Sequence, residues 1–374
     1  MQRLSGHPFA PWFLDRVRGS RSIALMTHVG PDADGLGSQL AFAAAGRRAG
    51  VAVFIVNEDP LPARYAWLDP HGLAGHFERD AALLEGAELG LVFDAHEIDR
   101  VARPAARMRA LGRDLLVLDH HAVRPEADVQ GVVATEFSST GELVYRLIQA
   151  LGWPVDVDVA RGVYAAISFD TGSFRFIRNQ AATFRVAAEL LDTGLDTNPI
   201  QEALFASRPR AEVELLGRIL SRIRFADRDR IAWVALDDSV TAGLDVAPDA
   251  VGEAIPILIG IEGVLIAMMV KPGKHPGESR LSLRSKTVVT IGHVARRYGG
   301  GGHAHAAGAT VATTDPAALA ADVLAQLSEA LAAQIDAGVG ADAADQVAVA
   351  AHAAETGTGD RKGQAAARGA GGPA

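Results

Sequence analysis

The feature that most constrains the fold of this chain is an alternation of short apolar runs with helical patterns in its first half. The runs are SIALMT (22–27), VAVFIV (51–56), LGLVFD (89–94) and DLLVLD (114–119). Each is short enough to be a strand that is buried on both faces. Helical patterns at 37–50 and 139–152 lie between and after them. This alternation predicts an α/β fold with a doubly wound, mostly parallel sheet.

The second half of the chain has a different pattern. Helical patterns continue over 181–223, and the runs at 230–238, 263–273 and 280–286 then alternate like antiparallel strands. The long apolar stretch 255–270 is interrupted by glycine and glutamate, so it is interpreted as two buried strands and a turn rather than a membrane span. A second, smaller α+β domain is therefore expected.

These patterns divide the chain into four parts, and a cleft is expected between the two domains. The parts are a larger α/β domain at 1–185, a helical connector at 186–225, the α+β domain at 226–330 and an Ala/Gly-rich tail, expected to be disordered, at 331–374.

Potential metal ligands stand where apolar runs end. They are His28, Asp94, Asp119 with His120 and His121, and Asp170 after the run YAAISF (164–169), joined by Asp32 and Asp34 from a glycine-rich turn. Because the carboxyl ends of parallel strands share one edge, we expect these side chains to converge there. Packed together without cations they would repel one another. Two divalent ions sharing a carboxylate remove that repulsion, and mixed Asp/His ligation without sulfur suits Mn²⁺, Zn²⁺ or Fe²⁺.

The glycine-rich turn HVGPDADGLGS (28–38) is not a phosphate-binding loop of the usual kind. It has no lysine after its glycines, as the P-loop requires, and no glutamate at the distance that closes an EF-hand. Taken alone, it is equally well interpreted as a turn with a helix-capping aspartate. Its place among the other motifs favours carboxylates that hold metal, which in turn holds phosphate.

Taken in order, the motifs resemble a known family. HVGPDADGLGS, VFDAHEIDR, LDHH and FDTGSFRF are similar to the four motifs of the DHH phosphoesterase superfamily, and RSK with HVARRYGGGGHAHAAGA resembles its C-terminal DHHA1 domain. The resemblance covers residues 20–330. The two-domain layout is similar to the NrnA-type oligoribonucleases and 3′-phosphoadenosine 5′-phosphate (pAp) phosphatases, and to the stand-alone dinucleotide phosphodiesterases.

The resemblance implies a role for each matching residue. His28 and Asp32 would bind one manganese ion, and Asp34, His120 and Asp170 the other, with Asp94 bridging the two. Asp119 would lie behind His120 and orient it. His121 would face the substrate phosphate or its leaving oxygen. His96 is not part of the family pattern, and it is interpreted as an ordinary polar loop residue.

The second domain is expected to bind the substrate. Arg284 would grip a terminal phosphate, although a place on the solvated face of a strand is a serious alternative. The glycine cluster at 299–302 would bring its backbone close to a ligand, with Gly300, Gly301, Gly302 and His303 as binding residues. The alternative for the cluster is a flexible turn.

Composition bounds the partners and the compartment. The chain has 374 residues, a net charge of −9 and no cysteine. A protein that coats long nucleic acid is normally basic, so this charge argues against that class. The resemblance implies short oligonucleotides or nucleotides as substrates. The absence of an N-terminal signal pattern and of a membrane span favours a cytoplasmic protein. Proteins of this kind can form homodimers, but no motif here requires one.

The expected reaction is metal-dependent hydrolysis of short oligonucleotides to mononucleotides, with pAp to AMP as an extension. Cleavage of cyclic di-AMP would use the same metal centre, so the motifs do not separate it from the first. A nucleotide-binding regulator without catalysis is disfavoured because every metal position is filled. A hydrolase of non-phosphate substrates is disfavoured by the second domain and by Arg284.

Overall fold

The computed structural model describes residues 9–121, 130–177, 180–246, 250–286, 289–302 and 304–336. The chain divides into two compact units at Ser207/Arg208, so the expected connector at 186–225 is split between them. Among the described residues no helix is both long and apolar enough to cross a membrane.

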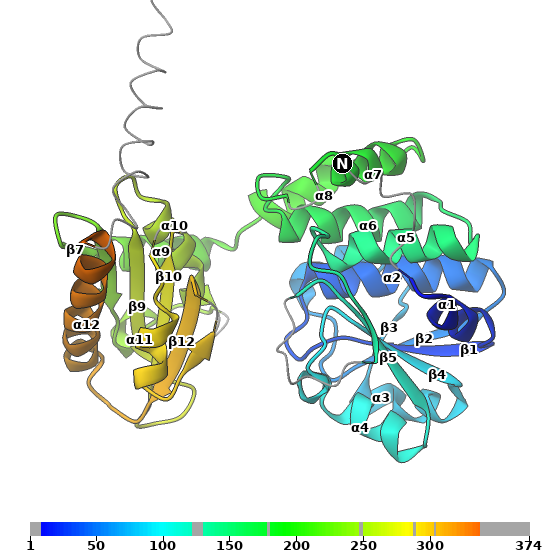
Figure 1. Ribbon diagram of the computed structural model, residues 1–374, viewed down its shortest axis with the longest axis horizontal. Coiled ribbons are helices and arrows are strands. Elements are labelled where there is room, and N and C mark those ends of the chain that lie inside the picture. The colour runs from blue at the N-terminus through cyan, green and yellow to red at the C-terminus, as the bar shows by residue number, and fades with distance from the viewer. Residues whose placement is uncertain are drawn as a thin grey trace, which may run out of the picture. The chain divides into compact units, whose positions relative to one another are not determined.

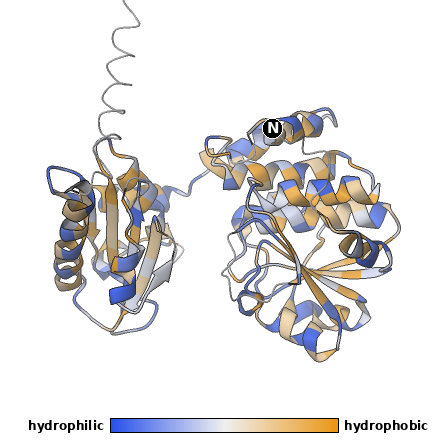
Figure 2. Cartoon of the chain, in the orientation of Figure 1, coloured by the Kyte–Doolittle hydropathy of each residue, from blue (hydrophilic) through white to orange (hydrophobic). Residues whose placement is uncertain are grey.

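The first unit is built on a parallel sheet with helices on both faces, which confirms the α/β prediction (Figure 1). Among the described residues its six strands are ordered β3-β2-β1-β4-β5-β6. Their bounds are β1 (Ser22–Met26), β2 (Ala52–Asn57), β3 (Ala74–His76), β4 (Leu89–Phe93), β5 (Asp114–Asp119) and β6 (Gly131–Val133). All four runs predicted as strands form the centre of this sheet. Hydrophobic residues fill most of their length (Figure 2).

One face of this sheet carries a thick helical layer. It consists of α1 (Pro11–Arg18), α2 (Ala33–Arg48), α5 (Thr140–Leu151), α6 (Val157–Asp170), α7 (Gln180–Leu191) and α8 (Asn198–Gln201). Helices α3 (Phe77–Asp80) and α4 (Arg103–Ala110) lie on the other face (Figure 1). The large core lies between the sheet and the first layer.

The run 164–169 was predicted as a strand, and this prediction is wrong. It is the last part of helix α6, which begins after Asp156 caps the backbone N–H groups of Asp158 and Val159. The helix is buried on nearly all sides because it packs against its neighbours α2, α5 and α7. A helix buried all round lacks a polar face, so a short window of it cannot be told from a buried strand.

The second unit is a mixed sheet covered by helices. Among the described residues its strands are ordered β11-β12-β10-β9-β8-β7. They are β7 (Arg224–Ala226), β8 (Ile231–Ala235), β9 (Ile266–Pro272), β10 (Ser279–Ser285), β11 (Gly301–Gly302) and β12 (Ala306–Val311). Helices α11 (Gly292–Arg297) and α12 (Pro316–Asp336) pack on one face, and α9 (Arg210–Leu220) and α10 (Ile255–Gly260) on the other.

Three expectations for this unit need correction. Residues 255–260 form helix α10 rather than a strand, because Pro256 in its first turn has the backbone angle that starts a helix. The helix is part of a crossover, so β8 and β9 pair in parallel, while the remaining pairs are antiparallel as expected. Helix α12 continues to Asp336, with Leu331 buried, so the first residues of the expected tail are helical. The rest of that tail lies outside the described residues.

Candidate metal centre

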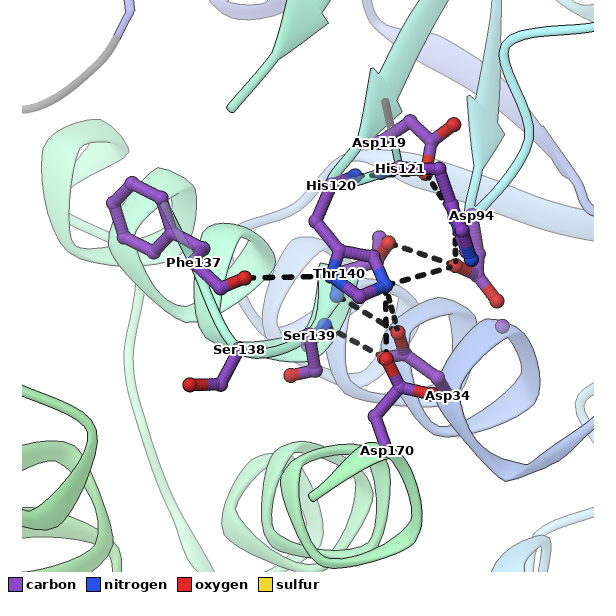
Figure 3. A network of polar contacts seen from close by, with 12 residues as sticks. Asp34, Asp94, Asp119, His120, His121, Phe137, Ser138, Ser139, Thr140 and Asp170 are labelled. Carbon is purple, nitrogen blue, oxygen red and sulfur yellow. Dashed lines mark hydrogen bonds and ion pairs between the residues drawn. The ribbon is translucent and has the colours of Figure 1, made fainter. Parts of the chain in front are cut away.

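Potential metal ligands follow three neighbouring strands, at the same edge of the first sheet. His28 follows β1, Asp94 follows β4, and Asp119 ends β5 directly before His120 and His121. Since β1, β4 and β5 are adjacent and parallel, their carboxyl ends lie side by side. The predicted convergence at this edge therefore rests on the pairing of these three strands (Figure 3).

The glycine-rich turn adds two carboxylates from the start of helix α2. Asp32 is the N-cap of this helix: its Oδ1 accepts hydrogen bonds from the N–H groups of Asp34 and Gly35 at 3.0 and 3.2 Å. Its Oδ2 lies 3.8 Å from His28 Nε2. Capping uses Oδ1 and leaves Oδ2 facing His28, so the capping interpretation of this turn does not exclude the metal-ligand interpretation.

Asp34 lies deeper, in the first turn of α2. Its two oxygens accept the backbone N–H groups of Thr140 and Gly141, at the start of α5, at 2.8 and 2.9 Å. This fixes the carboxylate, and its Oδ2 also lies 3.6 Å from His120 Nε2. The unpaired N–H groups at a helix N-terminus attract negative charge, so the contact with Thr140 opposes the rise in the pKa of Asp34 that burial causes.

Asp170 reaches the site from a helix and not from a strand. It is the last residue of α6, and its Oδ2 lies 2.9 Å from His120 Nε2 (Figure 3). Helix α6 comes this close because it crosses α2 at two glycines: a Cβ on Gly162 would lie 2.5 Å from the carbonyl oxygen of Gly37, and one on Gly37 would lie 2.4 Å from that of Gly162. The close crossing places the end of α6 over the sheet edge.

Asp94 occupies the centre of the cluster. Its Oδ2 is 3.5 Å from His28 Nε2, and its Oδ1 is 3.8 Å from His120 Nε2 and accepts a hydrogen bond from Thr140 Oγ1 at 3.1 Å. Its φ of 61° is in the left-handed region, which few non-glycine residues occupy. Strain of this kind persists where the surrounding structure enforces it, and it is concentrated at functional sites.

The side chains form two groups that are suited to cations, and a third group links them. His28, Asp32 and Asp94 form one, and Asp34, His120 and Asp170 the other. Asp94 also groups with His120 and His121, so it borders both. His28 Nδ1 lies 3.0 Å from the Val29 carbonyl oxygen and His120 Nδ1 3.4 Å from that of Phe137.

This pattern fits the requirements of a metal ligand. With Nδ1 donating to a carbonyl, the Nε2 atom of each histidine faces the carboxylates as an acceptor, which is how protein ligands to metals are usually oriented. The donors are nitrogen and oxygen only, as expected for Mn²⁺, Zn²⁺ or Fe²⁺. The buried part of the cluster is His28, Asp34, Asp94 and His120, whereas Asp32, Asp170 and His121 keep 29, 24 and 43% of their side chains exposed. One side of the centre is therefore open to solvent.

The electrostatics show a site that is unfavourable without cations. Burial, together with the charge of Asp94, raises the pKa of Asp32 to about 6. Burial and the charges of Asp94 and Asp170 raise the pKa of Asp34 well above its usual value. For His28, burial opposes protonation, but its contacts with Asp94, Val29 and Asp32 raise its pKa. The carboxylates repel one another in a poorly solvated space, and bound cations would relieve this.

This repulsion predicts the pH dependence of the metal-free protein. Because the pKa values of Asp32 and Asp34 are raised on folding, their contribution to stability is present below pH 4 and is lost as the pH rises through about 6. The raised pKa of His28 acts in the same direction. We expect the thermal midpoint in EDTA to fall between pH 5 and pH 7.5, with Asp32 alone accounting for about 1 kcal/mol.

The measurement is calorimetry in EDTA over this pH range, with Asp32→Asn as the comparison. The variant should show a flatter pH profile, and added Mn²⁺ should reverse the trend in the wild-type protein because protons compete with the metal. A wild-type midpoint that rises from pH 5 to pH 7.5 in EDTA would contradict this account of the site.

Asp119 is buried behind the cluster, and sequence reasoning missed one of its contacts. Its Oδ1 accepts the backbone N–H of His120 at 2.7 Å and lies 2.9 Å from His121 Nδ1, while its Oδ2 lies 2.6 Å from Nδ1 of His96. His96 is therefore a partner of the DHH motif rather than an ordinary loop residue. The signal in the sequence was its place two residues after Asp94, at the same sheet edge.

The contacts of Asp119 favour the protonated form of His121, the histidine that faces solvent. Burial alone would raise the pKa of Asp119, but hydrogen bonds and charge from His121, with His96, bring it far below its usual range. In turn the hydrogen bond to Asp119 raises the pKa of His121 to about 9. His121 is thus a cation at neutral pH in the metal-free protein.

The glycine cluster of the second unit has a structural role that was not anticipated. A Cβ on Gly300 would lie 2.1 Å from the carbonyl oxygen of Gly308, and Gly302 has a φ of +127° and lies against Ala306 and Ala307. The glycines let β11 pass close to β12. The Gly300 N–H donates to the Ala295 carbonyl at 3.0 Å, so it is not free to bind an anion, contrary to expectation.

Two of the remaining residues predicted to bind substrate, Gly301 and Arg284, are exposed. Arg284 is an exposed residue of β10, paired with Ala267 and Ala306. His303 lies outside the described residues.

Comparison with known proteins identifies the family. The N-terminal domain of the DHH family matches residues 22–167, and the DHHA1 domain matches residues 232–337. A protein of Thermus thermophilus described as "Bifunctional oligoribonuclease and PAP phosphatase NrnA" is 30% identical over 298 residues, which is 78% of this chain and 85% of that protein. The chain belongs to the DHH family.

Other relatives agree with this membership. The protein of the same description from Bacillus subtilis is 28% identical over 79% of this chain and 91% of its own length. Among solved structures, an exopolyphosphatase-related protein from Bacteroides fragilis superposes with a TM-score of 0.77 at 22% identity, over 86% of this chain and 96% of that one. That likeness concerns the fold alone, and it covers most of the chain.

Proposed function

We propose that this DHH protein is a metal-dependent phosphoesterase that hydrolyses short oligonucleotides and linear dinucleotides to mononucleotides, and pAp to AMP. The observation that carries the proposal is the pair of ligand groups that meet at Asp94, on the open edge of the sheet. Two relatives whose descriptions name oligoribonuclease and PAP phosphatase activity, with most of their length covered by this chain, support the substrate class.

The residues would hold two divalent ions, with Mn²⁺ as the expected metal. His28 and Asp32 would hold one ion and Asp34, His120 and Asp170 the other, and Asp94, which groups with His28 and with His120, would contribute to both. When bound, such a pair lowers the pKa of water to give a nucleophile near neutral pH and neutralises charge on the phosphoryl oxygens. The backbone N–H groups of Thr140 and Gly141 hold Asp34 in place.

His121 is proposed as a catalytic residue on the solvent side. It lies 3.5 Å from Asp94 Oδ1, it is the most exposed histidine of the cluster, and its contact with Asp119 raises its pKa in the metal-free protein to about 9. A cationic imidazole in this place stabilises negative charge on the phosphoryl group, and its proton is available to the leaving oxygen.

The test is product analysis by chromatography. The purified protein with Mn²⁺ is offered pApA, pGpG, a five-nucleotide RNA, pAp and cyclic di-AMP in parallel, each with an EDTA control. Mononucleotides from the linear substrates, with the cyclic one intact, are the expected result. Fast opening of cyclic di-AMP would move the protein to second-messenger turnover, and binding without EDTA-sensitive hydrolysis would make it a nucleotide-binding regulator.

Arg284 is proposed to bind a terminal phosphate, together with the exposed backbone at Gly301. A charged hydrogen bond of this kind contributes about 1.5–3 kcal/mol. We therefore expect Arg284→Ala to raise KM for pApA roughly 10–100-fold, with a much smaller effect on kcat. Arg296→Ala, an exposed arginine of α11, is the matched control and should leave KM unchanged. Equal KM values for wild type and Arg284→Ala would show that Arg284 lies on a solvated strand face and does not bind the substrate.

A further inference from the structure

The loop that carries Asp94 makes a second connection to the catalytic cluster, through His96. The Asp119 carboxylate is buried, with none of its side chain exposed, and stands between two imidazoles. His121 Nδ1 lies 2.9 Å from its Oδ1, and His96 Nδ1, on a side chain that is 10% exposed, lies 2.6 Å from its Oδ2. Asp119 therefore stands between His96 and the more exposed His121 (Figure 3 shows Asp119 beside His121).

The two oxygens of Asp119 are held very differently. Oδ1 receives the N–H groups of His120 and His121 and the ring of His121, at 2.7, 3.1 and 2.9 Å. Oδ2 receives the ring of His96. A carboxylate is a planar group that rotates about one bond, so a donor on Oδ2 fixes the plane in which Oδ1 meets the His121 ring. Without that donor, Oδ2 would be a buried acceptor with its hydrogen bond removed, which is costly. The carboxylate would then tend to rotate so that Oδ2 approaches the N–H donors of His120 and His121.

We propose that His96 is a positioning residue for the reaction: through Asp119 it sets the orientation of the His121 imidazole toward the substrate phosphate. The inference deepens the proposed function and rests on it, because it assigns His121 a part in phosphoester hydrolysis. The proposed role concerns the ring of His121 and not the binding of metal, since the contact of His96 is with Asp119, which is not one of the proposed metal ligands. Misplacing a catalytic group by a fraction of its working distance slows the chemical step while leaving substrate binding intact.

Three substitutions at position 96 separate the hydrogen bond from simple filling of space. The side-chain nitrogen of asparagine overlaps Nδ1 of histidine, whereas that of glutamine overlaps Nε2. We expect His96→Ala and His96→Gln to lower kcat for pApA about 10–100-fold with KM changed less than twofold, and His96→Asn to restore most of kcat. Bound Mn²⁺ per chain should be the same in all three. Rescue by glutamine but not asparagine, or an effect on KM alone, would overturn the proposal.

A double-mutant cycle tests whether His96 acts through His121. In a His121→Ala background the further change His96→Ala should lower kcat by no more than twofold, because the ring that it orients is already gone. The same factor of loss in both backgrounds would show that His96 works elsewhere, for example on the Asp94 loop, and would overturn the proposal.

An activity-independent measurement keeps this inference separate from the proposed function. The side-chain ¹⁵N–¹H signals of His121 are assigned by their loss in His121→Ala and recorded on the metal-free protein. They should shift in His96→Ala and His96→Gln and stay in place in His96→Asn. Signals that do not move in any variant contradict the proposal. If the wild-type protein hydrolyses none of the substrates, the proposed function fails, and these signals still decide whether His96 orients His121.

Discussion

Asp94→Asn is expected to lower kcat for pApA by at least ~10³-fold while the protein stays folded, a loss of about 4 kcal/mol of transition-state stabilisation. Asp94 is the residue that borders both ligand groups, so its charge is the one that a pair of cations would share. An amide oxygen keeps the shape but not the charge, and a carboxamide bridges two cations poorly. We therefore expect the substitution to slow the chemical step and not to unfold the protein.

The substitution is chosen to spare the fold. Asparagine is one of the few residues that occupy the left-handed region readily, and Asp94 has a φ of 61°. Its side-chain oxygen can still accept the hydrogen bond of Thr140. Asp99→Asn, an exposed residue of the same loop, is the control and should retain wild-type kcat. Circular dichroism and bound Mn²⁺ are measured together with the rate. An Asp94→Asn protein that is folded and fully active would show that Asp94 is not needed for hydrolysis.

Gly162→Ala is expected to damage both the fold and the proposed metal site. The new Cβ would lie 2.5 Å from the backbone oxygen of Gly37 and 3.1 Å from Ala41, so α6 has to move away from α2. Overpacking of this kind costs about 1–3 kcal/mol. Because Asp170 ends α6, the same movement withdraws a proposed ligand and should weaken Mn²⁺ binding about tenfold or more.

The same substitution at Gly217 provides the comparison. Gly217 lies within α9, and no atom lies within 4 Å of the Cβ that alanine would add there. Alanine forms helix more readily than glycine, so Gly217→Ala should stabilise the protein by up to about 1 kcal/mol and leave metal binding unchanged. Calorimetry and Mn²⁺ titration of both variants make the test. Equal stability of Gly162→Ala and wild type would show that the α2–α6 crossing is not as tight as described.

The sequence was most informative where one residue pattern had one physical cause. The four apolar runs are the central strands because strands buried on both faces read as short continuous hydrophobic segments. His28, Asp94 and Asp119 to His121 converge for the same reason: they follow three adjacent parallel strands. The carboxyl ends of parallel strands lie at one edge whatever the strand order, so this edge could be anticipated without any tertiary contact.

The errors fall where burial hides the helical period or where contacts cross the chain. Asp170 was assigned to the end of a strand because α6 is apolar on all sides. The stretch 255–260 was misread for a similar reason. The bond from His96 to Asp119 joins residues 23 positions apart, and no local pattern encodes it. Gly300 and Gly302 were correctly seen as positions of close approach, but what approaches is β12.

The central claim is that the residues around Asp94 form a two-ion centre for phosphoester hydrolysis, and a stepwise metal titration tests it most directly. Metal-free protein is loaded with Mn²⁺ in fractions of an equivalent, and bound metal and the rate of pApA hydrolysis are measured on the same samples. The account predicts two bound ions per chain, with hydrolysis appearing as the second one binds and disappearing with EDTA. Full activity in EDTA, or two bound ions without any hydrolysis of the short substrates, would contradict it.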